Sequence, residues 1–324
     1  MCYNASHKEM NTMLWLWILL GLAALTLIGA AVCFFMTYYS PTRTEEKMRA
    51  DRYPPGRAYV PYHPAMQEWA RQMDAMEYTP MEVTTPDGLT LRGRLYTLSP
   101  DAPVEILFHG YRGFLERDMS GAIERCFGVG HSALLVDQRA AGHSDGHVIT
   151  FGVKESEDVP LWIEAVAQHC GAHHPVYIGG VSMGATTVLL AAGRGLPPQV
   201  KGVLADCGYT TAKAIIQKVI RQLHLPARLL YPLVRLGAIL YGGFDPNRAD
   251  ATAAAAKIQV PTIFFHGDDD DFVPHEMSVE NHAACPAKKQ LVLTPGAGHG
   301  LCYPADPQGY IAAVKEFYAE NAGG

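Results

Sequence analysis

The stretch Val176–Leu190 constrains the fold of this chain more than any other. It begins as a short apolar run typical of a buried strand, turns at the G-x-S-x-G motif of residues 180–184, and continues with helical spacing. Such a sharp turn needs glycine on both sides of its central residue, because a Cβ there would collide with the neighbouring strand or helix. The pattern therefore predicts a strand, a strained turn that exposes Ser182, and a helix whose free N–H groups point at the space above it.

A second G-x-S-x-G motif, residues 142–146, surrounds Ser144. It follows a polar strand end and runs into residues 148–152, which show no helical pattern. Because a serine nucleophile of this type needs the strand–turn–helix context, the sequence favours Ser182 over Ser144. A serine can also stand at a tight turn only because a small residue fits there. Whether Ser182 is a nucleophile therefore depends on residues elsewhere in the chain.

The length of 324 residues is sufficient for one large α/β domain with an appendage, and a hydrophobic content of 48% allows a large core. The net charge of −6 and the lack of basic clusters argue against nucleic acid as a partner. The seven cysteines are scattered, odd in number and without a C-x-x-C pair. They predict neither a disulfide framework nor a zinc site, and they favour a reducing compartment.

Residues 13–36 form an apolar run that is long enough to cross a bilayer, with Thr26 as its one clearly polar side chain. A cleaved signal peptide fits less well, because the run is long, Lys8 is the one basic residue before it, and no small-residue cleavage site follows. Aromatic residues flank the run as at membrane interfaces: Trp15, Trp17, Tyr38 and Tyr39. We expect a tail over residues 1–12 and a single membrane anchor over residues 13–37.

Basic residues follow this anchor more densely than they precede it: Arg43, Lys47, Arg49 and Arg52. The positive-inside rule then predicts that the remainder of the chain lies on the cytoplasmic side, and the cysteine usage agrees. We expect residues 38–75 to be a proline-containing polar linker with a short helical approach, and residues 76–324 to be the catalytic domain.

A hairpin is predicted over residues 81–96, around the Pro-Asp-Gly turn at residues 86–88. Beyond it, apolar strand-like runs alternate with helical stretches up to a closing helix over residues 310–318. The strand-like runs are residues 104–108, 132–136, 176–179, 200–205, 262–265 and 290–293. This alternation predicts an α/β fold, with a mostly parallel sheet and helices on both faces.

One interval breaks the alternation. Residues 212–241 carry closely spaced isoleucines and leucines, interrupted by Pro226 and Pro232, between two predicted strands. The segment is too long and too apolar for a loop. We expect two or three short helices that form a cap over the strand ends, about residues 209–250; an ordinary crossover helix is the alternative.

A serine hydroxyl is a weak nucleophile and needs a base, which in turn needs an orienting acid. Two later strand-end loops supply candidates: residues 266–274, with a run of four aspartates, and residues 294–300, with His299. Loops that follow parallel strands meet at one edge of the sheet, where open α/β sheets place their sites. Asp206, at the end of an earlier strand, is an alternative acid.

Several motifs together resemble those of the α/β-hydrolase fold superfamily, and in particular membrane-anchored bacterial serine hydrolases similar to the serine aminopeptidase-like group. The resemblance covers about residues 76–320 and is carried by these segments: H-G-Y-R-G at 109–113, D-Q-R-A-A-G-H-S at 137–144, the turn at 180–184, and the loops at 266–274 and 296–300. Ala140 stands where the superfamily usually has glycine, in a loop outside the predicted catalytic residues.

The resemblance implies roles for individual residues. The pattern H-G-x-x-D-x-x-V-P selects Asp270 from the aspartate run, so that the expected triad is Ser182, Asp270 and His299. The H-G-x-x-G pattern implies an oxyanion hole formed by the backbone N–H groups of Tyr111 and Met183. In the same pattern His109 is expected to be structural, as are the other aspartates of the run.

We therefore expect a membrane-anchored serine hydrolase that cleaves carboxylic esters through an acyl-enzyme on Ser182, without a metal or organic cofactor. An apolar cap and a membrane tether suit small-molecule or lipid-like, amphiphilic acyl substrates. A peptidase, an amidase or an acyltransferase would use the same triad. A non-catalytic membrane-tethered binding protein is the alternative of another class, against which the complete set of triad residues and turn glycines argues.

Overall fold

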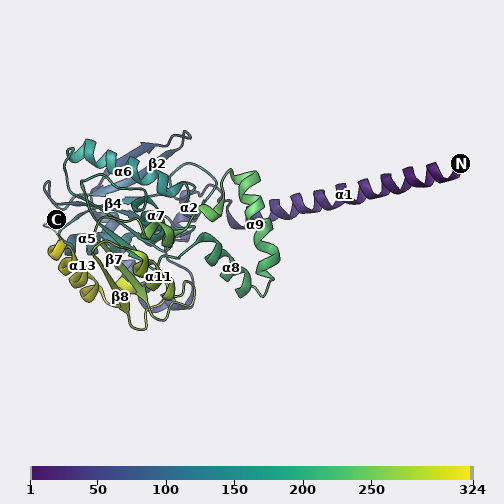
Figure 1. Cartoon of the computed structure of the whole chain (residues 1–324). Coiled ribbons are helices and arrows are strands. Elements are labelled where there is room, and N and C mark those ends of the chain that lie inside the picture. The colour runs from purple at the N-terminus through teal and green to yellow at the C-terminus, as the bar shows by residue number, and fades with distance from the viewer. Residues whose placement is uncertain (1, 322–324) are drawn as a thin grey trace. The chain divides into compact units, whose positions relative to one another are not determined.

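The computed structural model describes residues 2–321 of the chain (Figure 1). These residues form two compact units. The larger unit contains Ser40–Ile215 and the chain from Pro246 onward, and the smaller unit contains the chain up to Tyr39 together with Ile216–Asp245.

Within residues 2–321, the larger unit contains one eight-stranded sheet with the order β1-β2-β4-β3-β5-β6-β7-β8. The first two strands pair antiparallel with each other, β2 pairs antiparallel with β4, and all other neighbouring strands are parallel. The strands are β1 (Thr79–Thr84), β2 (Thr90–Tyr96), β3 (Val104–Phe108), β4 (Ser132–Val136), β5 (Val176–Val181), β6 (Val200–Asp206), β7 (Thr262–Gly267) and β8 (Lys289–Thr294). The predicted mostly parallel sheet, with a hairpin at its start, is confirmed.

Helices cover both faces of the sheet, and the alternation of side chains along the strands explains why. On β3, Ile106 and Phe108 pack in one apolar cluster with Trp162, whereas Leu107 packs in another with Ile123. A strand that is buried on both faces is mostly apolar, as β3 and β4 are, and the one charged residue of β3, Glu105, is paired with Arg125. The helices of this unit beyond β3 are α4 (Leu115–Asp118), α5 (Ser120–Val129), α6 (Glu155–Cys170), α7 (Met183–Ala192), η2 (Pro246–Arg248), α10 (Ala251–Ala255), α11 (Glu276–Ala284), α12 (Cys302–Ala305) and α13 (Pro307–Asn321).

The segment that we expected to be a linker, residues 38–75, carries three helices: α2 (Glu45–Ala50), η1 (Arg57–Tyr62) and α3 (His63–Ala75). On α3, Met66, Trp69 and Met73 are buried, and they follow the spacing of one helix face. The indole N–H of Trp69 donates a hydrogen bond to Glu124 on α5, at 2.9 Å. The second half of this segment therefore packs on the sheet domain as one of its helices.

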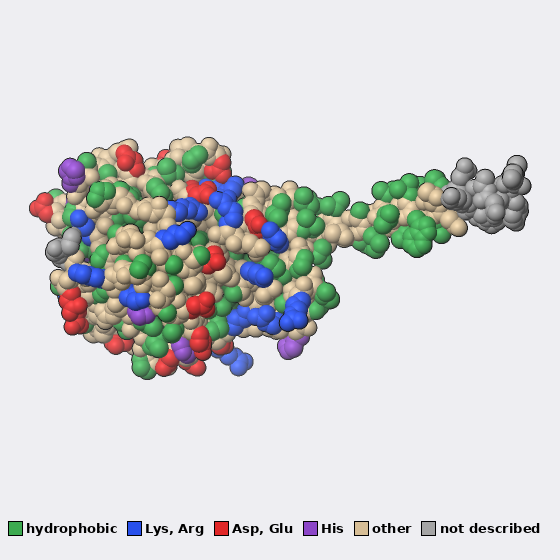
Figure 2. All heavy atoms as spheres, in the orientation of Figure 1, with side chains coloured by type: hydrophobic (Ala, Val, Ile, Leu, Met, Phe, Trp, Pro, Cys, Tyr) green, Lys and Arg blue, Asp and Glu red, His purple; other side chains and the backbone are tan. Residues whose placement is uncertain are grey.

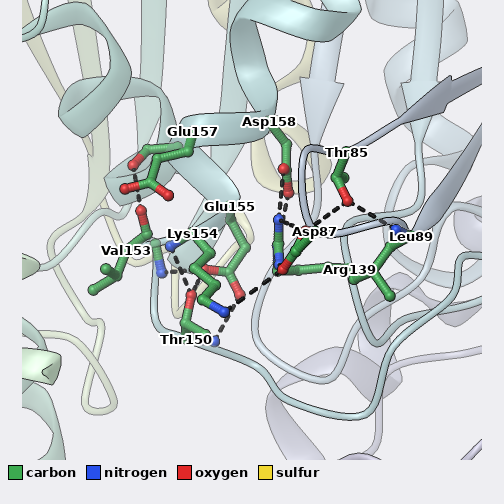
Figure 3. Close-up of polar contacts among 12 residues, drawn as sticks. Thr85, Asp87, Leu89, Arg139, Thr150, Val153, Lys154, Glu155, Glu157 and Asp158 are labelled. Atoms are coloured by element: carbon green, nitrogen blue, oxygen red, sulfur yellow. Dashed lines mark hydrogen bonds and ion pairs between the residues drawn. The ribbon is translucent and has the colours of Figure 1, made fainter. Parts of the chain in front are cut away.

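A buried arginine after β4 ties three parts of the larger unit together (Figure 3). Arg139 forms a two-pronged ion pair with Asp158 on α6, with N–O distances of 2.8 and 2.7 Å, and it also contacts Asp87 in the β1–β2 turn at 3.0 Å. A planar guanidinium suits such a bridge, because it directs several donors in fixed directions. The loop that carries the second serine motif is thus fixed to the hairpin and to α6.

The smaller unit is built from α1 (Cys2–Thr37), α9 (Ala227–Gly242) and most of α8 (Ala212–Gln222). Asn11–Thr37 is long and apolar enough to cross a membrane, with a mean hydropathy of 2.6 and little burial, and a signal sequence would share these properties. Figure 2 shows hydrophobic side chains along the outside of this helix. Two of the predicted helices between residues 212 and 241 are present, and Pro232 lies inside α9 without ending it. That they form a cap stays a prediction.

Candidate active site

Ser182 lies between β5 and α7 with φ 58° and ψ −116°, a backbone conformation that is costly for a residue with a side chain. The glycines on either side leave no room for a larger residue. A Cβ at Gly180 would collide with the backbone of Gly184, and a Cβ at Gly184 would collide with the Phe108 carbonyl oxygen. The predicted strand–turn–helix is thus present, with the serine at its apex.

The structure brings Ser182, His299 and Asp270 together from three separate strand-end loops. The Ser182 Oγ lies 2.9 Å from Nε2 of His299, and Nδ1 of the same ring lies 2.7 Å from Oδ2 of Asp270. In the tautomer that suits both contacts, Nδ1–H donates to the carboxylate and Nε2 accepts from the serine hydroxyl. This is the arrangement in which a histidine can remove the serine proton.

Asp270 is buried and well supplied with donors. Its Oδ1 accepts from the backbone N–H groups of Phe272 and Val273 at 2.9 and 2.8 Å, and Nε2 of His266 lies 3.1 Å from its Oδ2. Burial opposes ionisation of this carboxyl, but the hydrogen bonds from His266 and His299 outweigh it and hold its pKa well below the usual range. A carboxylate is therefore present at neutral pH to stabilise a charged imidazole.

The other candidate acids have different surroundings. Asp268, Asp269 and Asp271 are exposed, and Asp268 accepts a hydrogen bond from the backbone N–H of Gly296 at 2.6 Å, which joins the two loops. Asp206 is buried, and its carboxyl accepts from the Tyr310 hydroxyl at 3.1 Å. Burial raises the pKa of Asp206.

The loop after β3 passes directly beside the serine. A Cβ built on Gly110 would lie 3.5 Å from the Ser182 Cβ and 3.9 Å from its Oγ, so the backbone approaches closely because no side chain intervenes. Tyr111 follows in this loop, and Met183 is the first residue of α7, where backbone N–H groups have no partner within the helix. Both residues expected to donate to an oxyanion therefore flank Ser182.

His109 holds this loop in place. Its Nδ1 lies 2.8 Å from the Gly110 carbonyl oxygen, and its Nε2 accepts from the backbone N–H of Gln138 at 3.1 Å. Burial lowers the pKa of His109, which keeps the ring neutral and suits one donor and one acceptor nitrogen.

Ser144 is engaged in backbone contacts. Its hydroxyl donates to the Asp137 carbonyl oxygen at 2.6 Å and accepts from the Arg92 N–H at 2.8 Å. Its neighbour His143 faces Glu116, with Nε2 and Oε1 3.1 Å apart. These contacts fix the second serine motif to β2 and to the loop after β3, and they occupy the hydroxyl that a nucleophile would need free.

A cavity of about 500 Å³ opens at Ser182 and His299. Its apolar wall includes residues that sequence reasoning missed, because they come from the segment expected to be a linker: Tyr59, Met66 and Trp69. The signal that could have found Met66 and Trp69 is the three- to four-residue spacing of apolar side chains along α3. Tyr59 also donates from its hydroxyl to the His299 carbonyl oxygen at 2.9 Å.

Four arginines line the same cavity: Arg125, which is paired with Glu105, and Arg43, Arg112 and Arg117 near the loop after β3. Arg43 and Arg117 donate to the Arg112 carbonyl oxygen at 2.8 and 3.2 Å, and Arg117 pairs with Asp118 at 2.6 Å. The arginines thus support the loop beside the serine, and they make that part of the cavity wall cationic.

Cys207, Asp270 and His299 lie close enough to offer three ligand atoms to a metal ion. Asp270 and His299 are already engaged with each other and with Ser182, and burial raises the pKa of the Cys207 thiol well above its ordinary value. Metal binding would require the thiolate. This set of residues therefore suits proton transfer better than metal binding.

Comparisons with known proteins agree with this geometry. Residues 162–302, which include Ser182, Asp270 and His299, match the model of the serine hydrolase (FSH1) family. The structure is similar to an esterase from Pyrococcus furiosus, with a TM-score of 0.62 and 23% identity over 78% of this chain and 94% of the esterase. It is also similar to ferulic acid-bound Est1E from Butyrivibrio proteoclasticus, with a TM-score of 0.54 and 23% identity over 75% of this chain and all of Est1E (100%).

In sequence, the chain is 25% identical over 247 residues to the uncharacterized protein YqkD of Bacillus subtilis, a match that covers 75% of this chain and 80% of YqkD. The sheet order, the turn at Ser182 and the similarity to solved esterases point to the same conclusion. The chain has the α/β-hydrolase fold of these solved structures, and its residues 162–302 match the model of the serine hydrolase (FSH1) family.

Proposed function

We propose that this protein is a serine hydrolase that cleaves carboxylic esters through an acyl-enzyme on Ser182. The observation that carries the proposal is the continuous line of contacts from the Ser182 hydroxyl to His299 and on to Asp270, at 2.9 and 2.7 Å. The esterase names of similar solved structures support the choice of esters.

In this mechanism Ser182 Oγ attacks the ester carbonyl carbon while its proton passes to Nε2 of His299. The tetrahedral intermediate then expels the alkoxide, which takes the proton from His299 and leaves as an alcohol. Water, deprotonated by the same nitrogen, attacks the acyl-enzyme, and the carboxylic acid departs as Ser182 regains its proton. Asp270 orients the ring and stabilises its charged form.

The backbone N–H groups of Tyr111 and Met183 are proposed to stabilise the oxyanion of both tetrahedral intermediates. Each such donor contributes about 3 kcal/mol of transition-state stabilisation. The positive end of α7 adds to this, because Ser182 stands directly before its first turn.

The cavity supports an amphiphilic ester as substrate. Its aromatic and aliphatic wall suits an acyl chain, and the arginines beside the serine suit a polar or anionic group on the same molecule. A small-molecule or lipid-like acyl ester combines both features.

We further propose that residues 13–37 cross a membrane once and that the larger unit lies on the cytoplasmic side. The length and hydropathy of the helix support the span, and the basic residues that follow it support the orientation.

The test is labelling of the full chain in detergent with a fluorophosphonate probe, followed by peptide mapping. We expect stoichiometric label on Ser182, loss of label in Ser182→Ala, and unchanged labelling in the matched control Ser144→Ala. Label on Ser144, or no label on folded protein, would contradict the proposal. A panel of esters and anilides, with and without an acceptor alcohol, then separates esterase from amidase and acyltransferase activity by its products.

A further inference from the structure

Within the smaller unit, α9 packs against the last turns of α1. A Cβ on Gly237 would collide with the Ala30 carbonyl oxygen, so the two backbones touch at this glycine. The Tyr241 hydroxyl donates to the Leu27 carbonyl oxygen at 3.2 Å, and its ring lies 5.8 Å from that of Phe34. Figure 1 shows α9 lying across α1 and not alongside it.

The depth of these contacts along α1 can be compared with the thickness of a bilayer. Residues 11–28 of α1 are all exposed, and burial against the rest of the unit begins at Ala30. At 1.5 Å per residue, the exposed stretch measures about 27 Å, close to the hydrocarbon thickness of a bilayer. If α1 crosses a membrane, α9 therefore lies where the span leaves the hydrocarbon, and a helix that crosses the span at this level runs along the membrane surface.

The outer side of this helix pair is apolar. Leu229, near the start of α9, is 73% exposed, and Leu223, before it, is 59% exposed. Four further large hydrophobic residues are exposed in the same region: Leu225, Ile239, Leu240 and Tyr241. So many exposed large apolar side chains in one short segment of a folded protein indicate a contact with another apolar phase.

The charge of the same region is one-sided. Between Cys207 and Phe244 the chain has no aspartate or glutamate, although its total charge is −6. The five cations in this stretch are Lys213, Lys218, Arg221, Arg228 and Arg235, of which Arg235 pairs with Asp245 at 2.7 Å. Exposed leucines and basic residues in a segment without acidic residues are the signature of a helix that lies in an anionic membrane interface.

We propose that residues 216–242, the second half of α8 and all of α9, form a membrane-interfacial segment. Its leucines enter the acyl-chain boundary, and Lys218, Arg221 and Arg228 contact anionic lipid headgroups. The proposal rests on α1 crossing the membrane and is independent of the chemistry at Ser182.

The experiment is spin-label accessibility in the full chain reconstituted into nanodiscs, with labels at Leu229→Cys, Leu19→Cys and Val279→Cys in separate proteins. Leu19 reports the span, and Val279 is a comparably exposed aliphatic position on α11 of the larger unit. The partly exposed cysteines, Cys33 and Cys170, are first replaced by serine, and so is Cys2. Circular dichroism and thermal unfolding verify that each labelled protein is folded.

We expect labels at Leu229 and Leu19 to collide more with oxygen than with a water-soluble nickel chelate, and the label at Val279 to show the reverse. Adding anionic phosphatidylglycerol to phosphatidylcholine nanodiscs should raise the oxygen-to-nickel ratio at Leu229. In a variant with Lys218, Arg221 and Arg228 each replaced by Gln, the effect of phosphatidylglycerol should be lost.

Three results would overturn the proposal. Water-like accessibility at Leu229 with lipid-like accessibility at Leu19 would place α9 outside the membrane. Water-like accessibility at both positions would remove the span on which the proposal depends. A Leu229 label shielded from both reagents, with spin–spin broadening, would show that a second copy of the chain covers this face.

Discussion

At the scale of single residues, the two buried aspartates near the serine differ in what they contact. Asp270 meets His299 and two backbone N–H groups, whereas Asp206 meets the hydroxyl of Tyr310. Burial alone raises a carboxyl pKa, so the donors around Asp270 are what keep it charged. The Asp270 carboxylate can therefore stabilise a charged His299 imidazole, whereas the Asp206 carboxyl contacts a hydroxyl group.

This difference predicts opposite outcomes for two isosteric substitutions. Asp270→Asn should reduce kcat by about 10³–10⁴-fold, because an amide favours the wrong histidine tautomer. Asp206→Asn should retain most of the activity. Ester hydrolysis by the full chain in detergent measures both, with thermal unfolding as the control for folding. Loss of activity in Asp206→Asn alone would mean that the acid is misassigned.

Candidate site residues could be identified from the sequence where a local motif requires particular residue types for a physical reason. The glycines around Ser182 and His299, and the aspartate four residues after His266, are visible in the sequence and lie at one site in the structure. The wall of the cavity was not predictable in the same way, because Tyr59 and Trp69 come from a distant segment whose prolines suggested an extended linker. Folding brings these two residues to the cavity, and no local sequence pattern predicts such a long-range contact.

At the scale of elements, α3 joins the wall of the cavity to the stability of the fold. Trp69 is buried, hydrogen-bonded to Glu124, and lies 5.3 Å from the ring of Tyr303. Trp69→Ala should lower the free energy of unfolding by about 3–5 kcal/mol and widen the cavity, which should shift ester preference toward bulkier acyl groups. Urea unfolding and a chain-length series measure the two effects. The matched control, Leu98→Ala at an exposed position, should change the free energy of unfolding by less than about 0.5 kcal/mol; equal effects of the two substitutions would contradict the packing of α3.

A buried ion pair joins β3 to α5. Glu105 contacts Arg125 at 2.8 and 3.1 Å, with both side chains buried. Burial opposes ionisation of Glu105, but Arg125 and His131 outweigh it and lower its pKa to about 2. Because the folded pKa lies below the unfolded value of about 4.3, the pair stabilises the fold above that pH, and the contribution is lost as the pH falls toward 2.

Glu105→Gln should therefore cost about 3–5 kcal/mol at neutral pH, because it leaves Arg125 buried without its counter-charge. The difference between the native protein and the variant should shrink as the pH falls below about 4.3, where Glu105 becomes protonated in the unfolded chain while it is still ionised in the folded protein. Urea unfolding at several pH values measures it. Glu82→Gln removes an exposed ion-pair partner of Arg92 and should change the free energy of unfolding by less than about 1 kcal/mol throughout. If the free energy of unfolding of Glu105→Gln differed from that of the native protein by the same amount at every pH, the result would contradict an ion pair between Glu105 and Arg125.

At the scale of the whole molecule, the sequence predicted helices over residues 212–241 from their apolar spacing but not what they pack on. Periodicity reports that a helix has an apolar face, and it carries no information about which surface covers that face. In the structure α9 packs with α1, although the two segments are about 200 residues apart in the sequence, and no local sequence pattern predicts these contacts. The predicted sheet is different, because the alternation of strands and helices along the chain predicts a mostly parallel sheet, although it did not predict the strand order, in which β2 lies beside β4 and β3 beside β5.

The backbones of α9 and α1 approach each other closely at Gly237 and Ala30, beside the contacts of Tyr241 with Leu27 and Phe34. Gly237→Leu should separate the two helices, because the added side chain has to displace the Ala30 carbonyl and the Phe34 side chain. The connection between α8 and α9, residues 223–226, should then become more sensitive to limited proteolysis in nanodiscs. Gly21→Leu is the matched control, since nothing lies within 4 Å of a Cβ at that position of α1, and it should leave the proteolysis rate unchanged. Equal rates for both variants would show that α9 is held by something other than its contact with α1.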